Sequence, residues 1–282
     1  MNLEFFTEGL DCLMYCGMKL SPEQRILIEN SLIALQNDNR FTGMYLWGRI
    51  TATKNDYYIA FGYTNDCLKD RKYFYSLDQF QWQLLPFVQS PKIFQATILA
   101  REPFIGDPSL MTYVKLDPTF DIVGNQVAGI SRPEVVKLKE EERLAAIVFI
   151  ITEECAICPR GAFYKMTDGR VIPNQMFRGL NDLQIDNQSY YQLYRLPRND
   201  LKVNLAKRSD YNYAIDFLDT IDCVIPLCQA FALNMQRNEG LVIIKSCLWL
   251  GMTFFHKINS HKHGFLYLGD GKKNFDLLFM YY

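Results

Sequence analysis

The chain has 282 residues, of which 49% are apolar, 22% charged and 14% aromatic, and its formal net charge at pH 7 is −1. A chain of this length forms one large domain or two small ones and buries a substantial core without help from disulfides or metals. Its near-neutral charge excludes a protein-wide basic footprint of the kind that binds nucleic acid or an anionic membrane.

Two helices are predicted within the first forty residues. Apolar residues recur at helical spacing between Leu3 and Met14. A second helix begins after Ser21, which caps it, with Pro22 at the first helical position and Gln24 completing a capping box. The apolar face predicted for this helix consists of Ile26, Ile28, Leu32, Ile33 and Leu35.

An aromatic β-hairpin follows and is the most informative part of the sequence. Two alternating segments flank a polar break at 54–56, which is the pattern of two strands joined by a turn. Alternation in the first segment places Tyr45, Trp47 and Arg49 on one side and Met44, Leu46, Gly48 and Ile50 on the other. In the second segment Tyr57, Ile59, Phe61 and Tyr63 share a side.

This hairpin carries large rings but no nucleophile, no histidine and no metal-ligand spacing. Tyrosine and tryptophan are favoured at protein interfaces, because each combines a large apolar ring with a polar tip. We therefore expect the hairpin to form core and surface rather than to catalyse. Its candidate partner-contact residues are Tyr45, Trp47, Arg49, Tyr57 and Tyr58.

The middle of the chain alternates short elements with turns. A strand is predicted at 73–77 and an amphipathic segment at 93–99, and residues 106–109 have the composition of a turn. Residues 117–133 lose all periodicity, which predicts a loop or weak subdivision within a single compact unit spanning 1–282.

A charged run at 137–143 leads into the apolar segment 144–151, which we expect to be a helix entering the core. The glutamates at 140–142 are expected on a solvated helix face or as caps. Asp168-Gly169, between 162–166 and 171–173, is a hairpin signal.

The C-terminal third is predicted to be rich in strands. After a weakly helical segment at 183–193 and an ambiguous one at 216–221, strands are predicted at 231–237, 241–245, 252–256 and 265–268. Early helices and hairpins throughout the chain predict an α+β fold, with a largely antiparallel sheet of hairpins and packed helices.

The ends and apolar windows of the chain favour an intracellular, soluble protein. Residues 1–6 lack a basic segment followed by an apolar run, which argues against a signal peptide. The most apolar windows, such as 144–151, are too short and too closely flanked by charges to span a bilayer. The eight cysteines are accordingly expected to be reduced thiols.

One alternative function is that of a zinc-stabilised adaptor. Cys155 and Cys158 form a CxxC pair that Cys223 and Cys228 could complete as a four-thiolate site. The second pair is spaced by four residues among apolar neighbours, and Pro159-Arg160-Gly161 follows the first pair at once. Buried cysteine is common as a small apolar residue, so we favour a structural role for these thiols.

A second alternative is a small-molecule enzyme with Arg49, Asp56 and His256 in one cleft. These three residues are polar and lie beside predicted strands, and the enzyme would require them to converge. The remaining histidines, His261 and His263, lie in a lysine-rich segment, and solvated loop histidines are the simplest interpretation of the group.

A series of short segments, in a defined order along nearly the whole chain, carries a family resemblance. They are 47–50, 56–60 with Gly62, 75–77 followed by Trp82 and 84–86, 106–109, 141–144, 159–162, 177–180, 216–219, and finally Trp249, Gly251, 253–256, 264–274 and 276–277. As an ordered set they resemble the radial spoke head protein 9 family of ciliary axonemes.

This resemblance implies a non-enzymatic subunit of the radial spoke head, located in the axoneme of a motile cilium or sperm flagellum. It implies other spoke head subunits as partners, especially the 4/6-type proteins, and neither cofactor, metal, nucleic acid nor membrane. Three departures stand out, and one is that neither Cys155 nor Cys158 belongs to the family pattern. Leu250 occupies a place where the family usually has proline, and the segment 186–213 matches poorly.

Overall fold

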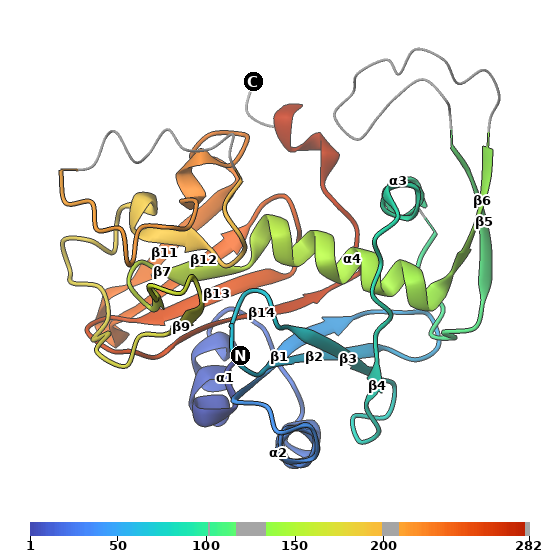
Figure 1. The fold of residues 1–282 in the computed structure, drawn as a ribbon, viewed down its shortest axis with the longest axis horizontal. Coiled ribbons are helices and arrows are strands. Elements are labelled where there is room, and N and C mark those ends of the chain that lie inside the picture. Colours follow the sequence, from blue (N-terminus) through green and yellow to red (C-terminus); the bar gives the residue numbers. More distant parts are fainter. Residues whose placement is uncertain (101, 117–133, 199–208, 280–282) are drawn as a thin grey trace.

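A mixed sheet of eight strands, in the order β11-β12-β13-β14-β1-β2-β3-β4, organises the computed structural model (Figure 1). The structure describes residues 1–100, 102–116, 134–198 and 209–279. One antiparallel half consists of β1 (Gly43–Ile50), β2 (Tyr57–Tyr63), β3 (Lys72–Ser76) and β4 (Gln83–Leu84). The other consists of β11 (Phe231–Gln236), β12 (Leu241–Ser246), β13 (Met252–Lys257) and β14 (His263–Gly269). The predicted α+β fold class, with its largely antiparallel sheet, is confirmed.

The two halves meet at the centre of the sheet, where β1 and β14 pair in parallel from Gly48–Tyr267 to Ile50–Gly269. Every other pairing within this sheet is antiparallel. The hairpins that build each half were predicted from alternation and turn composition. The parallel junction was not predicted, because it joins segments more than two hundred residues apart.

Helices cover both faces of the sheet (Figure 1). On one face lie α1 (Phe6–Met14), which follows the short 3-10 helix η1 (Leu3–Phe5), and α2 (Pro22–Asn39). On the other lies α4 (Glu140–Cys155), whose residues Leu144, Val148 and Ile151 pack with Trp47 and Phe61 of the sheet. Burial on both faces explains why central strands such as β2 are apolar at almost every position.

A β-bulge at Trp47 alters the side on which the end of β1 packs. Leu46 pairs with Ala60 and Gly48 pairs with the adjacent Ile59, so Trp47 is an extra residue in β1 with no pairing partner in β2. Beyond the bulge the sides exchange, and Ile50 packs with Trp47 in the α4-side core. The predicted placement of Ile50 beside Met44 and Leu46 is therefore wrong, whereas Tyr57, Ile59, Phe61 and Tyr63 do share a side.

Helix α2 has the predicted start but a different buried face. Ser21 and Gln24 form the capping box, each side chain accepting a hydrogen bond from the other residue's backbone N–H. Ile28 and Leu32 are buried against the sheet, but Ile26 is 61% exposed and Ile33 also faces outward. Residues two apart on a helix lie about 200° apart around its axis, so one face cannot bury both Ile26 and Ile28. The predicted apolar face of α2 therefore covered too wide an arc of the helix.

The remaining elements surround α4. Helix α3 (Pro91–Leu99) packs beside it, and β5 (Met111–Leu116) and β6 (Glu134–Lys139) form a two-stranded sheet next to α3. Small two-stranded sheets pair β7 (Ile157–Pro159) with β10 (Tyr191–Leu193) and β8 (Phe163–Lys165) with β9 (Val171–Pro173). Short 3-10 helices complete the described chain: η2 (Gln188–Tyr190), η4 (Ile221–Cys223), η5 (Arg237–Glu239) and η6 (Phe275–Phe279).

Two predictions for the middle of the chain differ from the structure, and a third lies outside the described residues. The charged run at 137–143 is not one helical segment, because β6 ends at Lys139 and α4 begins at Glu140. The weak helix predicted at 183–193 is wrong, because its end forms β10, whose residues are buried by pairing with β7. The loop predicted at 117–133 lies outside the described residues. Within those residues, no helix has both the length and the apolar character that crossing a membrane requires.

Candidate protein interface

Most of the predicted partner-contact residues belong to the core. Trp47 and Tyr57 have no exposed surface and Tyr58 has almost none. Tyr45 is half-buried, with its ring stacked on Phe61 at 5.0 Å between centroids. Arg49 is half-buried and forms an ion pair with Asp56 at 3.4 Å. The rings of Trp47, Tyr57 and Tyr58 therefore help to build the core of this structure, and a contact between this region and a partner stays a prediction.

The polar tips of these buried rings are bonded to helices. Trp47 donates its indole N–H to Thr152 Oγ1 on α4 at 2.9 Å. Tyr58 accepts a hydrogen bond from the side chain of Gln24 on α2 at 3.0 Å. Tyr57 donates its hydroxyl to Glu140 Oε1 at 2.7 Å, and burial first, then Glu140, raises the pKa of Tyr57. The aromatic hairpin therefore ties the sheet to helices on both of its faces.

Glu140 is a buried acceptor rather than the solvated glutamate that its neighbours suggested. Besides the Tyr57 hydroxyl, its carboxylate accepts hydrogen bonds from the backbone N–H groups of Ile105, Gly106 and Asp107. It is 3% exposed. A carboxylate is stabilised in a buried position when several N–H groups point at it. Glu140 thus holds the 105–107 turn against strand β2 and the first turn of α4.

Two buried ion pairs fix Asp216 and Asp219, which lie shortly before η4. Arg160 binds Asp216 and Asp210, each at a closest distance of 2.5 Å. Arg195 binds Asp219 at 2.9 Å, and both side chains are almost completely buried. Paired charges of this kind hold one geometry, because breaking them would leave an uncompensated charge inside the protein. The segments 159–162 and 216–219 are accordingly structural.

The residues of the proposed enzyme do not converge. Arg49 pairs with Leu268 near the end of β14, whereas His256 pairs with His263 at its start. Five residues of strand separate these positions by about 16 Å, which is too far for one small reaction centre. His256 is buried, and within the described residues no hydrogen bond reaches either of its ring nitrogens. Burial, with a smaller effect of His263, lowers the pKa of His256 to about 3. The solvated interpretation holds for His261 only, since His263 packs against Phe177.

The CxxC thiols point to different structural partners. Cys155 lies 3.3 Å from the hydroxyl of Ser246, and Cys158 contacts the carbonyl of Gln192 at 3.6 Å. Burial raises the pKa of both thiols. Within the described ranges, no three His, Cys, Asp or Glu side chains are placed to hold a metal ion.

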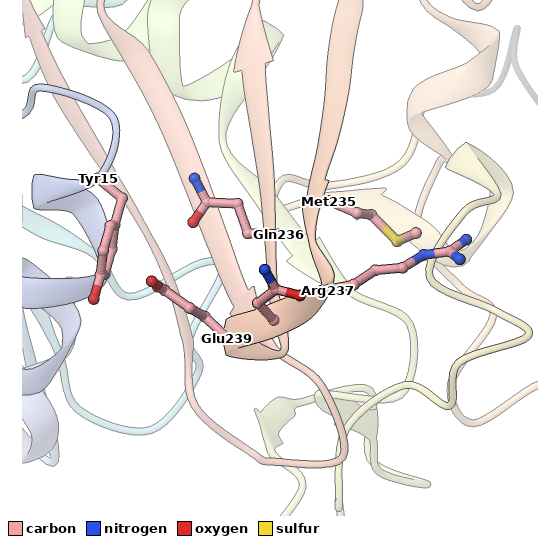
Figure 2. A pocket seen from close by; sticks show the side chains of 6 residues that line it. Tyr15, Met235, Gln236, Arg237 and Glu239 are labelled. Carbon is pink, nitrogen blue, oxygen red and sulfur yellow. The ribbon is translucent and has the colours of Figure 1, made fainter.

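One surface hollow lies between the end of α1 and the β11–β12 turn. It measures about 600 Å³ and is lined by Tyr15, Met235, Gln236 and the η5 residues Arg237, Asn238 and Glu239. Figure 2 shows the carboxylate of Glu239 extending toward Tyr15, and its charge and hydrogen bond raise the pKa of that phenol. The lining is mostly polar, so this hollow offers little apolar surface to a partner.

A more apolar hollow, of about 660 Å³, lies beside the C-terminal end of α4. Its apolar walls are Leu193, Val224, Ile225, Pro226, Leu248, Phe275 and Leu277. A second hollow of about 370 Å³, between α3, α4 and residues 271–276, shares Lys273, Asn274 and Phe275 with the first. Phe275 therefore stands as a ridge between two hollows and is 57% exposed. We name residues 273–277 the Phe275 ridge.

Short contacts to α4 and to the β12–β13 connection hold the Phe275 ridge in place. Lys273 binds Glu154 at 2.8 Å, and the same carboxylate accepts the indole N–H of Trp249 at 2.7 Å. Asn274 donates its backbone N–H to Leu248 and its side-chain amide to Cys247. The ridge is thus pre-organised, which lowers the entropy cost of binding.

The rim of the larger hollow adds exposed apolar side chains and a few charges. Ile225 is 70% exposed, and Leu227 beside it is also largely exposed. Arg198 and Glu153 flank the hollow as a half-exposed pair at 4.0 Å. An apolar centre with a polar rim is the usual anatomy of a protein interface. This surface is the candidate site that the sequence analysis missed, because strand periodicity says nothing about which apolar residues of a loop stay exposed.

Comparison with known proteins gives a consistent result along the whole chain. No family model matches it. It is 37% identical over 281 residues to the radial spoke head protein 9 homolog of Danio rerio, covering 99% of this chain and 100% of that protein. The homologs of Mus musculus and Homo sapiens are 36% identical over 281 residues and 34% identical over 280 residues, each across 99% of this chain and their own full length.

Proposed function

Because this chain belongs to the radial spoke head protein 9 family, we propose that it is a non-enzymatic structural subunit of the axonemal radial spoke head that supports regulated ciliary and flagellar motility through protein–protein packing. The observation that carries the proposal is similarity to proteins of that name over their entire length. Similarity of this extent covers both halves of the sheet and the helices on both faces.

The arrangement of polar residues supports a scaffolding role. The side chains with the most hydrogen bonds, Glu140 and Arg160, are satisfied by partners within the protein and hold turns and loops in place. Such residues keep a surface in one shape, which a permanent assembly needs for tight packing.

The Phe275 ridge and its two hollows are the surface that we assign to packing in the spoke head. The partner is another spoke head subunit, and a 4/6-type protein is the preferred one. Apolar side chains from that subunit would enter the hollows on either side of Phe275, with Ile225 and Leu227 enlarging the contact. Interface residues in such pockets contribute most of the binding free energy.

The test is incorporation into the spoke head of cells that lack the endogenous protein. Cells expressing Phe275→Asp together with Ile225→Asp should assemble cilia that beat without normal coordination, and spoke head subunits should not co-purify with the tagged chain. The matched control is Leu183→Asp, because Leu183 is 94% exposed and lies outside both hollows. Normal beating and an intact spoke head in cells without any copy of the protein would contradict the proposed function.

A further inference from the structure

The antiparallel pair β5–β6 forms an arm at the N-terminal end of α4 (Figure 1). Its register runs from Met111 opposite Lys139 to Leu116 opposite Glu134. We name residues 111–116 and 134–139 the β5–β6 arm. Its position leaves one face against the protein and one face directed outward.

The inner face of the arm packs on helix α3. Leu116 and Leu138 are buried there with Ala96, and Val114 and Val136 join the same small cluster. Because side chains alternate along a strand, this packing fixes which residues face outward. The orientation of the arm is therefore set by its own apolar contacts.

The outer face interleaves lysines with apolar side chains. Cross-strand pairs bring Met111 opposite Lys139, Tyr113 opposite Lys137, and Lys115 opposite Val135. All six side chains are exposed, Tyr113 to 66%. The face therefore carries three positive charges and no carboxylate.

The lysines of this face have no ionic partners within the part of the chain that the structure describes. The salt bridges of the described residues do not include Lys115, Lys137 or Lys139. Of the glutamates that follow β6 in the chain, Glu140 is buried under its own donors, and Glu142 accepts the backbone N–H of Lys139. The three positive charges are therefore exposed together on one face of the arm.

Lysines on exposed strands also protect against edge-to-edge aggregation. That role accounts for the charges but not for the exposed Tyr113, Met111 and Val135 between them. Exposed aromatic and methionine side chains grouped on one face are typical of binding surfaces.

We propose that the outer face of the β5–β6 arm docks an acidic segment of a neighbouring protein, in which two carboxylates at alternate positions are followed, at the next alternate position, by an apolar residue. Lys137 and Lys139 lie two residues apart on one strand, about 7 Å along its axis. Alternate residues of an extended segment share one face and have the same spacing, so two of its carboxylates match these lysines while the apolar residue at the next alternate position meets Val135. Tyr113, opposite Lys137, adds apolar contact on the same face. This inference goes beyond the proposed function and uses a surface separate from the Phe275 ridge.

A direct binding experiment tests the chemistry. The probe is a fluorescent ten-residue peptide, Glu-Ser-Glu-Ser-Val-Ser-Glu-Ser-Glu-Ser, which places Glu and Val on one face when extended. It is titrated with the full-length protein and followed by anisotropy at low and physiological salt. The combined variant Lys115→Glu, Lys137→Glu, Lys139→Glu should weaken binding at least tenfold, and Tyr113→Ser should weaken it severalfold. The matched control, Lys19→Glu, Lys69→Glu, Lys245→Glu, changes net charge equally on exposed lysines elsewhere and should change affinity less than twofold.

Three outcomes would overturn the proposal: no measurable binding of the peptide, equal weakening by the two triple variants, or tighter binding of anionic lipid vesicles or RNA than of the peptide. Thermal unfolding of each variant confirms that it is folded. In axonemes, a photo-crosslinking phenylalanine analogue in place of Tyr113 should form a crosslink to a segment rich in Asp and Glu, and a crosslink to a segment without acidic excess counts against the proposal. Spoke heads that assemble normally while the arm variant loses peptide binding would leave the proposed function intact.

Discussion

Arg160 donates two parallel hydrogen bonds to Asp216, from Nε to Oδ1 at 2.5 Å and from Nη2 to Oδ2 at 2.7 Å. Both side chains are nearly buried, and 56 residues of chain separate them. The fork of a guanidinium fits a carboxylate in this way only when both backbones are held in register. The pair therefore anchors the segment after β7 to the loop before η4.

Asp216→Ala should destabilise the protein by about 3–5 kcal/mol, because it leaves Arg160 buried with part of its charge uncompensated. Urea unfolding followed by circular dichroism measures the change. The matched control is Asp168→Ala, which breaks a pair with Arg170 at the same 2.5 Å distance but on the surface. Loss of that exposed pair should cost less than about 1 kcal/mol. Equal losses in the two variants would show that burial of the Arg160 pair contributes nothing.

Glu140→Gln should destabilise the protein by about 2–4 kcal/mol. Glu140 Oε1 and Oε2 accept backbone N–H groups from the 105–107 turn, and Oε1 also accepts the Tyr57 hydroxyl. Glutamine offers one acceptor oxygen and turns an N–H₂ group toward these donors. Glu142→Gln is the control on the same helix turn, since among the described residues the half-buried Glu142 accepts a hydrogen bond only from the backbone N–H of Lys139. Its effect should stay below about 1 kcal/mol, and a comparable loss in both variants would contradict the buried-acceptor interpretation.

Stability should fall as the pH drops below about 6.5, and His256 is one cause. The pKa of His256 is lowered to about 3, chiefly by burial, and the nearby backbone of Ser260 offsets only part of this. The pKa of this histidine in the unfolded chain is about 6.5, so below that pH the unfolded chain binds a proton that the folded chain does not. The free energy of unfolding therefore falls by about 2 kcal/mol by pH 5. The loss continues until the pH reaches the folded pKa.

The variant His256→Phe removes this titration while keeping an aromatic ring in the core. Its free energy of unfolding should depend less steeply on pH between 7 and 5 than that of the parent chain, by about the same 2 kcal/mol. His261→Phe is the control, because His261 is exposed. An unchanged pH dependence in His256→Phe would mean that other groups account for the whole effect.

Local chemistry predicted much of this fold because local chemistry determines much of it. The Ser21–Gln24 capping box, the 57–63 strand and the C-terminal hairpins follow from neighbours in sequence, and the structure has them where the pattern places them. The predictions are wrong where contacts between residues distant in sequence determine which side chains are buried. The burial of Trp47 and Tyr57 depends on α4, almost a hundred residues away, so alternation could show that the rings shared a side but not that a helix covers it.

The candidate interface was beyond sequence analysis for a related reason. In the sequence, nothing distinguishes Phe275 from any other aromatic residue near a strand end. Its exposure depends on the contacts that Lys273 makes with Glu154 and Asn274 makes with Leu248. The arm was hidden because β5 and β6 are separated by residues 117–133, too long a connection for a hairpin signal. Each surface is created by an interaction across the fold rather than by a motif.

Gly48→Ala should destabilise the protein by about 3 kcal/mol or more, because the bulge at Trp47 places Gly48 where a side chain has no room. A Cβ atom at Gly48 would lie 2.1 Å from the backbone carbonyl oxygen of Tyr267, on the parallel neighbour β14, and the backbone angle φ of Gly48 is +150°. The control is Gly17→Ala, where φ is +81° and a Cβ meets nothing within 4 Å. That change carries only backbone strain of about 1–2 kcal/mol. Urea unfolding of both variants separates the cost of backbone strain from that of the steric clash. If the free energy of unfolding falls no more in Gly48→Ala than in Gly17→Ala, β1 and β14 can move apart at little cost in free energy.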